Sequence, residues 1–147
     1  MKFTNSLIKG KLLKRYKRFF ADIKVNNKII TAHCPNTGSM QGLLDQGNEV
    51  LVTEHNDPKR KLKFTLEIIK AKKRYVGVNT HRANKIVNHG LEKKLISEFK
   101  TIKNIKPEFK FSDDTRFDFL CDSYLIEVKN VTLFRENDIE EFPDEVT

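Results

Sequence analysis

The sequence lacks the features of a membrane or secreted protein. No apolar run in its 147 residues approaches the roughly 20 residues that cross a bilayer. The N-terminus is basic, but no apolar block with a small-residue cleavage site follows it, so no signal peptide is expected. These absences predict a cytoplasmic protein that makes no membrane contact.

Cysteine and histidine are also sparse. Cys34 and Cys121 are the two cysteines, and neither belongs to a C-x-x-C or Cys/His ligand spacing. Buried free thiols are therefore expected, rather than a disulfide or a zinc site. His33 adjoins Cys34, but neighbouring residues of a strand point to opposite faces, so this pair does not converge on one metal.

Charge is divided unevenly along the chain. Residues 1–82 hold 18 Lys and Arg against 6 Asp and Glu, a net charge of +12. Residues 83–147 hold 10 against 14, a net charge of −4, and the whole chain carries +8. A basic half followed by an acidic half indicates two functional surfaces.

The basic half gathers its charge in two clusters that we expect to bind nucleic acid. The predicted contacts are Lys14, Arg15, Lys17, Arg18, Lys61, Lys63, Lys73 and Arg74. The aromatic residues among the charges are Tyr16, Phe19, Phe20, Phe64 and Tyr75. Aromatic rings beside cations offer stacking platforms next to groups that neutralise phosphates. The alternatives are a solvated lysine-rich face and aromatic residues that belong to the core.

Turn residues divide the first part of the chain into short strands. Asn26 and Asn27 separate two apolar stretches, and because Asn tolerates the positive φ of tight turns, they predict a hairpin. Further strand-like stretches lie at 49–54, 62–71 and 74–79. About five strands without a helix predict a small closed barrel, and an oligonucleotide/oligosaccharide-binding (OB) barrel fits the strand number and the charge.

From residue 79 the pattern becomes helical. Asn79 or Thr80 can cap a helix in which Ile86 and Val87 follow at helical spacing, and Gly90 can end it.

A second short helix is predicted over 91–100, and a strand opens at 109–111, after Pro107. We therefore expect one domain over residues 1–78 and another over residues 79–147.

Two strand-like runs, 116–121 and 124–129, are joined by the two-residue turn Asp122-Ser123. If Cys121 and Tyr124 flank this turn, the register places Leu120 opposite Leu125. Alternation then directs one set of apolar side chains to the core, namely Phe117, Phe119, Ile126 and Val128.

The other face of this hairpin gathers charged residues. The same register sets Asp118 opposite Glu127 and Arg116 opposite Lys129, and two opposed carboxylates require a positive charge near them. Mg²⁺ or Mn²⁺ suits such oxygen ligands and holds waters, one of which becomes a nucleophile with the help of a nearby lysine. We therefore predict Asp118 and Glu127 as metal ligands and, with Lys129, as catalytic residues. Glu108 can add a further carboxylate.

The alternative for the same four residues is structural. Arg116, Asp118, Glu127 and Lys129 also have the signs and spacing of a cross-strand salt-bridge lattice. The tripeptide Glu-x-Lys decides nothing, because it occurs four times in this chain.

Six stretches of the chain resemble the sugar fermentation stimulation protein A family. They are KRYKRF at 14–19, HCPNTGSM at 33–40, VNTHRAN at 78–84, RFDF at 116–119, IEVKNVTL at 126–133 and FPD at 142–144. The resemblance implies an N-terminal OB fold, a C-terminal α/β domain of the PD-(D/E)xK restriction-endonuclease-like superfamily and non-sequence-specific DNA binding. It also implies that Asp118, Glu127 and Lys129 occupy the Asp, Glu and Lys positions of that superfamily.

The chain ends at Thr147, soon after the FPD stretch, whereas members of this family continue further. The resemblance therefore predicts an incomplete restriction-endonuclease-like domain, either as a fragment or truncated product or with the missing part supplied by another chain. The domain that would carry catalysis is then expected to lack its later strands and covering helices, and the sequence leaves the oligomeric state open.

These features bear on three functions. The first is a DNA-binding protein with a nuclease-like metal site, and the second is a non-catalytic DNA-binding regulatory module in which the hairpin carboxylates are structural. A sugar-metabolising enzyme, the third, has no supporting site in the sequence.

Overall fold

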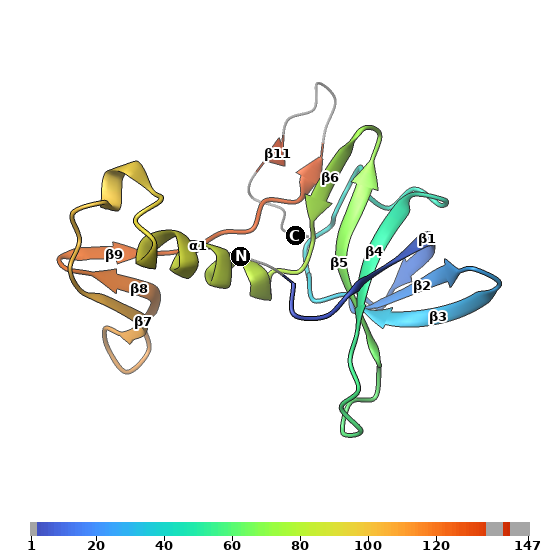
Figure 1. Cartoon of the computed structure of the whole chain (residues 1–147), viewed down its shortest axis with the longest axis horizontal. Helices are drawn as coiled ribbons and strands as arrows, with labels where there is room; N and C mark the ends of the chain where they lie inside the picture. Colours follow the sequence, from blue (N-terminus) through green and yellow to red (C-terminus); the bar gives the residue numbers. More distant parts are fainter. Residues whose placement is uncertain (1–2, 135–139, 142–147) are drawn as a thin grey trace. The chain divides into compact units, whose positions relative to one another are not determined.

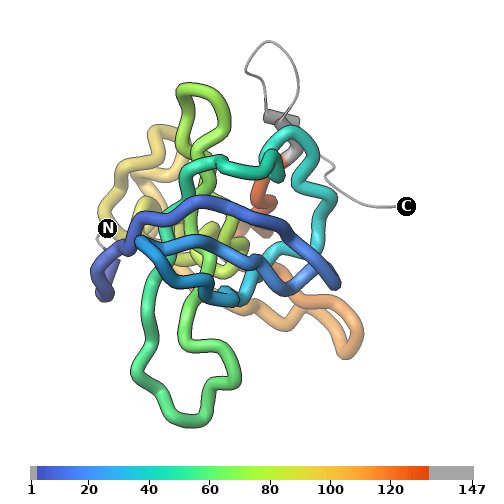
Figure 2. Tube along the Cα trace, turned by 90° about the vertical axis from the view of Figure 1, so that its right-hand side faces the viewer, coloured from blue at the N-terminus to red at the C-terminus, as the bar shows by residue number. Residues whose placement is uncertain are grey.

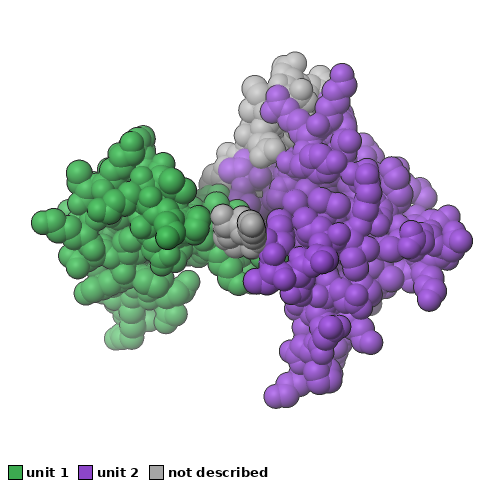
Figure 3. All heavy atoms as spheres, viewed as in Figure 1, with its two compact units in different colours: residues 1, 81–129 green, residues 2–80, 130–147 purple. Residues whose placement is uncertain are grey.

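The protein is described by a computed structural model that covers residues 3–134 and 140–141. The chain divides into two compact units (Figure 3). One contains residues 81–129, and the other combines residues 2–80 with 130–147. We refer to them as the hairpin unit and the barrel unit and describe each separately.

Six strands form the main sheet of the barrel unit (Figure 1). They are β1 (Leu7–Tyr16), β2 (Phe20–Val25), β3 (Lys28–His33), β4 (Glu49–Glu54), β5 (Phe64–Ala71) and β6 (Arg74–Gly77). The predicted Asn26-Asn27 hairpin is confirmed, because Val25 pairs with Lys28 and Asn26 has a φ of 52°.

Pairing around the sheet closes it into a barrel. The strand order is β3-β2-β1-β4-β5-β6, and β3 also pairs with β5 in parallel, so that β1 to β5 form a ring to which β6 is added. Such a five-stranded barrel, with β1 between β2 and β4, is the OB architecture that the sequence predicts. Figure 2 shows β1, β2 and β3 side by side on the face turned toward the viewer.

Strand β1 bends, and this allows it to pair with both β4 and β2. Its first half pairs with β4, its second half pairs with β2, and the register shifts at Leu13, which is the extra residue of a bulge. Gly10 lies where the barrel closes tightly, since a Cβ atom there would come within 2.5 Å of Ile23 Cγ2. A bulge and a glycine are the usual means of bending a strand around a small barrel.

The barrel interior is apolar. Its fully enclosed side chains include Leu12, Ile23, Met40, Leu43, Val50, Val52, Leu66 and Ile69. Met40 and Leu43 come from the 34–48 segment between β3 and β4, so this connection covers part of the core. Cys34 is also fully buried there as a free thiol, as predicted.

The beginning of that segment binds two distant parts of the chain. Pro35 O accepts a hydrogen bond from the Thr80 hydroxyl at 2.6 Å, and Asn36 Nδ2 donates to Thr132 Oγ1 at 3.1 Å. Asn36 and Thr132 are both buried, with exposures of 4% and 1%. The residues just before and just after the hairpin unit are therefore held at adjacent positions of the barrel unit.

The hairpin unit has one α-helix among its described residues, α1 (His81–Glu92), followed by the 3-10 turn η1 (Ser97–Phe99). The sequence placed the end of α1 at Gly90, but the helix runs two residues further. Lys94 then adopts a φ of 54°, and Leu95 N donates back to Gly90 O at 2.8 Å. The predicted second helix over 91–100 is wrong, because this left-handed residue interrupts it and Leu95 is 69% exposed.

Three antiparallel strands complete the unit in the order β7-β8-β9. They are β7 (Ile105–Lys110), β8 (Arg116–Cys121) and β9 (Tyr124–Ile126). Pro107 was expected to precede the strand but lies within β7. An edge strand tolerates proline, because the N–H group that proline lacks is not needed on the side that has no neighbouring strand. Their core contains Leu91, Ile102, Phe119 and Cys121, packed against Ile126 and Val128.

The turn and register predicted for the last hairpin are confirmed in part. Cys121 pairs with Tyr124 and Leu120 with Leu125. The predicted Asp118–Glu127 and Arg116–Lys129 pairings are not formed, because the described ladder ends at Phe119 and Ile126. Beyond these residues, Val128 N donates its hydrogen bond to the side chain of Asp118 and not to the backbone of β8.

Two short strands, β10 (Leu133–Phe134) and β11 (Glu140–Glu141), pair with each other. The FPD stretch at 142–144 lies outside the described residues.

Within the described ranges, no helix has both the length and the apolar character needed to cross a membrane.

Candidate functional site

The outer face of β1, β2 and β3 carries an aromatic row. The register aligns Tyr16 with Phe20 and Phe20 with His33, one residue from each strand. The Tyr16 and Phe20 rings stack with centroids 5.5 Å apart and planes 17° from parallel. The row therefore presents planar groups across three neighbouring strands.

A carboxylate lies in the next row of the same face. Asp22 Oδ1 accepts hydrogen bonds from the Thr31 hydroxyl at 2.8 Å and the Tyr16 hydroxyl at 3.2 Å. Lys14 Nζ is 3.7 Å from Asp22 Oδ2 and 5.1 Å from the centre of the Tyr16 ring. The charge of Asp22 is thus balanced locally, and the middle of the face is not strongly cationic.

Cationic groups occupy the β1–β2 turn at the end of this face. Lys17 and Arg18 both have positive φ, 49° and 60°, and both are exposed. Phe19 N donates to Lys17 O at 2.7 Å, and the Phe19 ring is 44% exposed. Two consecutive non-glycine residues in this region cost about 1–3 kcal/mol each, and such strain is often found at binding sites.

The β4–β5 loop, residues 55–63, is the second basic loop. Asp57, with Pro58 after it, begins a tight turn in which Arg60 N donates to Asp57 O at 3.2 Å and Lys59 N donates to Asp57 Oδ1 at 2.9 Å. His55 N closes the loop by donating to Lys63 O at 2.7 Å. Lys61 and Lys63 are exposed.

The two loops lie at the same end of the barrel. Phe20 directly follows the β1–β2 turn and pairs with His33, and His33 pairs with Thr65, just after the β4–β5 loop. Arg60 Nη2 donates to Thr65 Oγ1 at 2.9 Å, which holds the Arg60 side chain against this edge. Arg60 is not among the predicted contacts, and its position at this edge follows from the parallel pairing of β3 with β5, which closes the barrel.

Arg15, in contrast, is used inside the barrel unit. Its guanidinium donates to Asn36 O at 2.8 Å, to Arg18 O at 3.1 Å and to Ser39 O at 3.4 Å. It therefore fixes the β1–β2 turn against the 34–48 segment and does not extend toward solvent as Lys17 does.

Lys73, in the β5–β6 turn, and Arg74, which begins β6, are both exposed. Strand β5 has eight residues and separates this turn from the β4–β5 loop, so the two are roughly 25 Å apart along the strand. The eight predicted contacts consequently do not form one patch. Lys17, Arg18, Lys61 and Lys63 share one end of the barrel, and Lys14 lies in the next row of the face, beside Asp22.

The predicted metal residues occupy the end of the β8–β9 hairpin. Asp118 Oδ1 accepts a hydrogen bond from Asn84 Nδ2 in α1, and Asp118 Oδ2 accepts one from Val128 N at 2.7 Å. Glu127 Oε1 is 2.8 Å from Lys129 Nζ, and both side chains are about half exposed, at 47% and 52%.

Arg116 is paired differently from the prediction. Its Nη1 lies 3.7 Å from Glu108 Oε2, across β7 and β8. The charged side chains of this region therefore form two separate ion pairs, and Asp118 interacts with amide groups.

The carboxylates around Asp118 are spread over several segments of the hairpin unit. Among residues 3–134 and 140–141, no group of three or more His, Cys, Asp or Glu side chains could hold a metal ion together. Both oxygens of Asp118 accept hydrogen bonds that connect α1 and the segment after β9 to β8.

A buried carboxylate that the sequence did not single out lies in the barrel unit. Glu67 is the bulged residue of β5 and is 2% exposed. Its Oε1 accepts from the Thr53 hydroxyl at 2.8 Å, and its Oε2 accepts from Asn79 Nδ2 at 2.9 Å. His55 Nε2 is 3.2 Å from the same hydroxyl of Thr53. The bulge at Glu67 interrupts the alternation of β5, and the sequence pattern does not reveal it.

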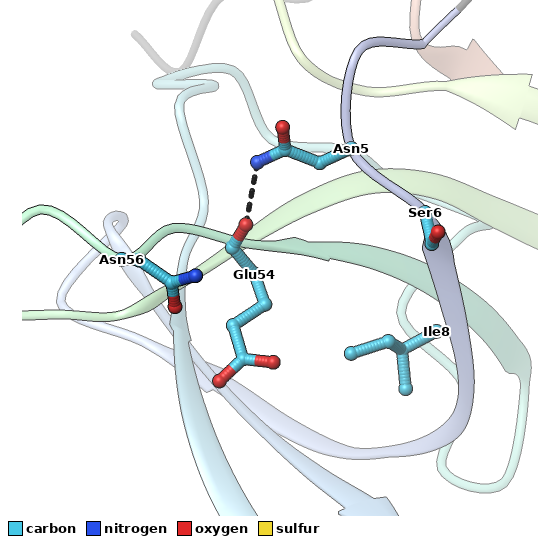
Figure 4. Close-up of a pocket in the computed structure, with 5 residues that line it drawn as sticks. All are labelled: Asn5, Ser6, Ile8, Glu54 and Asn56. Atoms are coloured by element: carbon cyan, nitrogen blue, oxygen red, sulfur yellow. Dashed lines mark hydrogen bonds between the residues drawn. The ribbon is translucent and has the colours of Figure 1, made fainter.

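A hollow of about 360 Å³ opens beside β1 and β4 and is lined by Asn5, Ser6, Ile8, Glu54 and Asn56 (Figure 4). The Glu54 carboxylate points into it, and Asn5 Nδ2 donates to the Glu54 backbone carbonyl. Its lining contains an acidic side chain and no basic one, which does not suit a phosphate.

Several pKa shifts follow from local contacts. The pKa of Glu49 is lowered because Lys9 Nζ lies 2.7 Å from its carboxylate. Backbone N–H groups of Lys103 and Asn104 donate to Asp122 and lower its pKa. Burial raises the pKa of the Cys34 thiol, which does not suit a nucleophile.

Comparison with known proteins identifies both units. Residues 13–78 match the SfsA N-terminal OB domain, and residues 81–147 match the sugar fermentation stimulation protein RE domain. A sugar fermentation stimulation protein homolog of Pelagibacter ubique is 62% identical over 151 residues, covering 100% of this chain and 65% of the relative. The homolog of Bdellovibrio bacteriovorus is 44% identical over 163 residues, covering 100% of this chain and 67% of the relative.

The chain thus spans about two thirds of the length of the curated relatives it matches. A solved structure, SfsA of Pyrococcus furiosus in complex with Ca²⁺, shares the fold with a TM-score of 0.69 at 22% identity, over 82% of this chain and 51% of that chain. With both domain models matched in order and with relatives this similar over its whole length, the chain belongs to the sugar fermentation stimulation protein family.

Proposed function

We propose that this chain binds DNA without sequence preference through the end of its barrel where the β1–β2 turn and the β4–β5 loop meet. The observation that carries the proposal is the convergence of these two basic loops beside the aromatic row, established by the Phe20–His33–Thr65 pairings. Exposed lysine and arginine side chains contribute affinity by neutralising phosphates, and this contribution is independent of base sequence.

Fluorescence anisotropy with labelled DNA at several salt concentrations tests the proposal. Affinity should fall steeply with salt, and each cation removed from the interface should reduce the slope of log K against log salt by about 0.7–0.9. The double variant Lys17→Gln/Arg18→Gln should show this reduction.

The matched control is Lys73→Gln/Arg74→Gln, which removes the same two charge types from the β5–β6 turn of the same barrel. It should change the slope less than the loop variant does. Equal effects of the two variants, or binding that does not weaken with salt, would contradict the proposed interface.

For the hairpin unit we propose a structural role of the carboxylates, so that the chain acts as a non-catalytic DNA-binding module. This is supported by the two hydrogen bonds that Asp118 accepts and by the exposed Glu127–Lys129 pair. The competing proposal, a nuclease-like Mg²⁺ or Mn²⁺ site at Asp118 and Glu127, draws on the family resemblance and on the Ca²⁺ named for the Pyrococcus furiosus relative.

Incubation with plasmid DNA and Mg²⁺ or Mn²⁺ separates the two proposals. Neither the parent chain nor Asp118→Ala should cleave the plasmid. Because Asp118→Ala also removes two structural hydrogen bonds, Glu127→Gln is the matched variant that alters only an exposed ion pair. Cleavage by the parent that Glu127→Gln abolishes would establish the nuclease-like site.

A further inference from the structure

We infer that the barrel has a second binding site, which accepts a small aliphatic amine with its ammonium group on Glu54 and its alkyl chain on an apolar floor. The site lies where the first residues of β1, the β2–β3 turn and the last residues of β4 surround an opening of the barrel. We call it the barrel opening. The inference does not depend on DNA binding.

The strand register directs the Glu54 side chain toward this opening. Val52 is fully buried in the barrel core and pairs with Ile8 of β1. Side chains two positions apart on a strand share a face, so Glu54 follows Val52 on the inward-facing side of β4. Glu54 pairs with Phe64 of β5, and paired side chains are neighbours on one face. A carboxylate thus occupies the last inward-facing position of β4, beside apolar side chains.

Two adjoining hollows share Ile8 and Glu54 in their linings. The first, of about 360 Å³, has a polar rim formed by Asn5, Ser6 and Asn56 around the Glu54 carboxylate (Figure 4). The hydroxyl and amide oxygens of such a rim are neutral acceptors, which suit the three N–H donors of an ammonium group.

The second hollow, of about 380 Å³, supplies the apolar floor. Ile8, Val25, Ile30 and Phe64 line it, and all four are partly buried side chains that pack against the barrel core. An alkyl chain on this floor loses its contact with water. Hollows of this volume at the mouths of β-barrels are a common place for small-molecule sites.

The Glu54 carboxylate determines the charge of the ligand. Among residues 3–134 and 140–141, no cationic side chain forms an ion pair with it. Asn5 Nδ2 donates to the backbone carbonyl of Glu54 and leaves the carboxylate to the hollow. A cationic ligand therefore gains a charge-assisted hydrogen bond here, whereas an anionic ligand is repelled.

Lys28 limits the ligand to one positive charge. It pairs with Val25 across the β2–β3 turn and lines the same hollow as the apolar floor. A second ammonium group, at the other end of the alkyl chain, would approach Lys28 and be repelled. The site should therefore prefer a monoamine to a diamine of the same length.

Titration of the full chain with n-hexylammonium chloride at neutral pH, followed by two-dimensional amide NMR, tests the inference. The amide signals of Ile30, Glu54 and Asn56 should shift and saturate. Affinity should rise roughly three- to fourfold with each methylene from propylamine to hexylamine, because each one buries further apolar surface. Hexanol and 1,6-diaminohexane should both bind more weakly than hexylamine.

Glu54→Gln keeps the shape of the side chain and removes its charge, so it should weaken hexylamine binding roughly 10-fold or more. Glu49→Gln is the matched control, because it removes the same charge from the same strand. It lies roughly 16 Å away along β4, beyond the Debye length of about 8 Å at 0.15 M salt, and should change the affinity less than about twofold.

Four results would overturn the inference. They are shifts that do not saturate, an affinity that is independent of alkyl length, equal losses in Glu54→Gln and Glu49→Gln, and hexanol or the diamine binding as tightly as hexylamine. The series of alkyl lengths uses the unaltered chain, so it decides the matter even if Glu54→Gln does not fold.

Discussion

Asn84 Nδ2 donates to Asp118 Oδ1, while Asp118 Oδ2 accepts a hydrogen bond from Val128 N at 2.7 Å. One carboxylate thereby connects α1, β8 and the segment that follows β9. The residue that the family resemblance places at the Asp position of the superfamily thus connects three segments of the hairpin unit.

Replacement of Asp118 should therefore lower stability whether or not DNA is present. Asp118→Ala leaves the Val128 N–H and the Asn84 amide without their acceptor, and we expect a loss of about 1–3 kcal/mol. Urea denaturation measures it. The control Glu127→Gln alters an ion pair that is about half exposed and should cost less than about 1 kcal/mol. Equal stability of wild type and Asp118→Ala would show that these hydrogen bonds do not stabilise the unit.

Gly10 should not tolerate a side chain. A Cβ atom at this position would lie 2.5 Å from Ile23 Cγ2 and 3.0 Å from Lys24 O. Gly10→Ala must push β1 away from β2, and overpacking of this kind costs about 1–3 kcal/mol. Gly77→Ala is the matched control, because a Cβ atom there has no neighbour within 4 Å. Thermal denaturation of the two variants should show a lower midpoint for Gly10→Ala; the reverse order would contradict the tight closure.

Glu67 should be more important for folding than for binding. Glu67→Ala leaves the buried Thr53 hydroxyl and the Asn79 amide without their acceptor, and we expect a loss of about 2–3 kcal/mol. Glu67→Gln keeps one acceptor oxygen and should lose less. Chemical denaturation together with DNA titration of the folded fraction separates the two effects. A Glu67→Ala variant of full stability that no longer binds DNA would instead assign Glu67 to the interface.

Asp122 should make stability depend on pH. Backbone N–H groups lower its folded-state pKa below the ordinary value of 3.8. Its charged form therefore contributes stability that is fully present above 3.8 and is lost as pH falls through the folded-state pKa. Asp122→Asn keeps a residue that tolerates the φ of 50° at this position but removes the charge.

The melting temperature of Asp122→Asn should accordingly lie below that of wild type near neutral pH. The difference should narrow as the pH falls below 3.8 and the wild-type carboxylate becomes protonated. A difference that does not change with pH would mean that the charge of Asp122 makes no contribution.

The sequence predicted the parts of the fold that depend on local turn chemistry. Asn26-Asn27 and Asp122-Ser123 both form the turns that their residue types favour, and they set the registers of their hairpins. The β1–β2 turn was not recognised, because Lys17 and Arg18 are not turn-forming residues. Their positive φ is supported from outside the turn, by the guanidinium of Arg15 bound to Arg18 O.

The site was predictable in residue type but not in arrangement. Basic clusters and aromatic residues were evident along the chain, yet the separation of Lys73 from Lys63 depends on the course of β5. Similarly, extension of the β8–β9 ladder predicted a facing pair of carboxylates. The ladder ends early because the Asp118 carboxylate accepts the hydrogen bond of Val128 N in place of a backbone carbonyl. The alternation of residue types along the strands does not reveal this side-chain acceptor.

The attachment of Thr80 and Thr132 to Pro35 and Asn36 has a consequence for how the chain folds. Because both ends of the 81–129 segment are held at adjacent residues once the barrel has formed, that segment becomes a closed loop. A closed loop has fewer unfolded conformations than a free chain of the same length, so its own folding is opposed by less entropy. Formation of the barrel thus acts on the hairpin unit as a cross-link does, without any covalent bond.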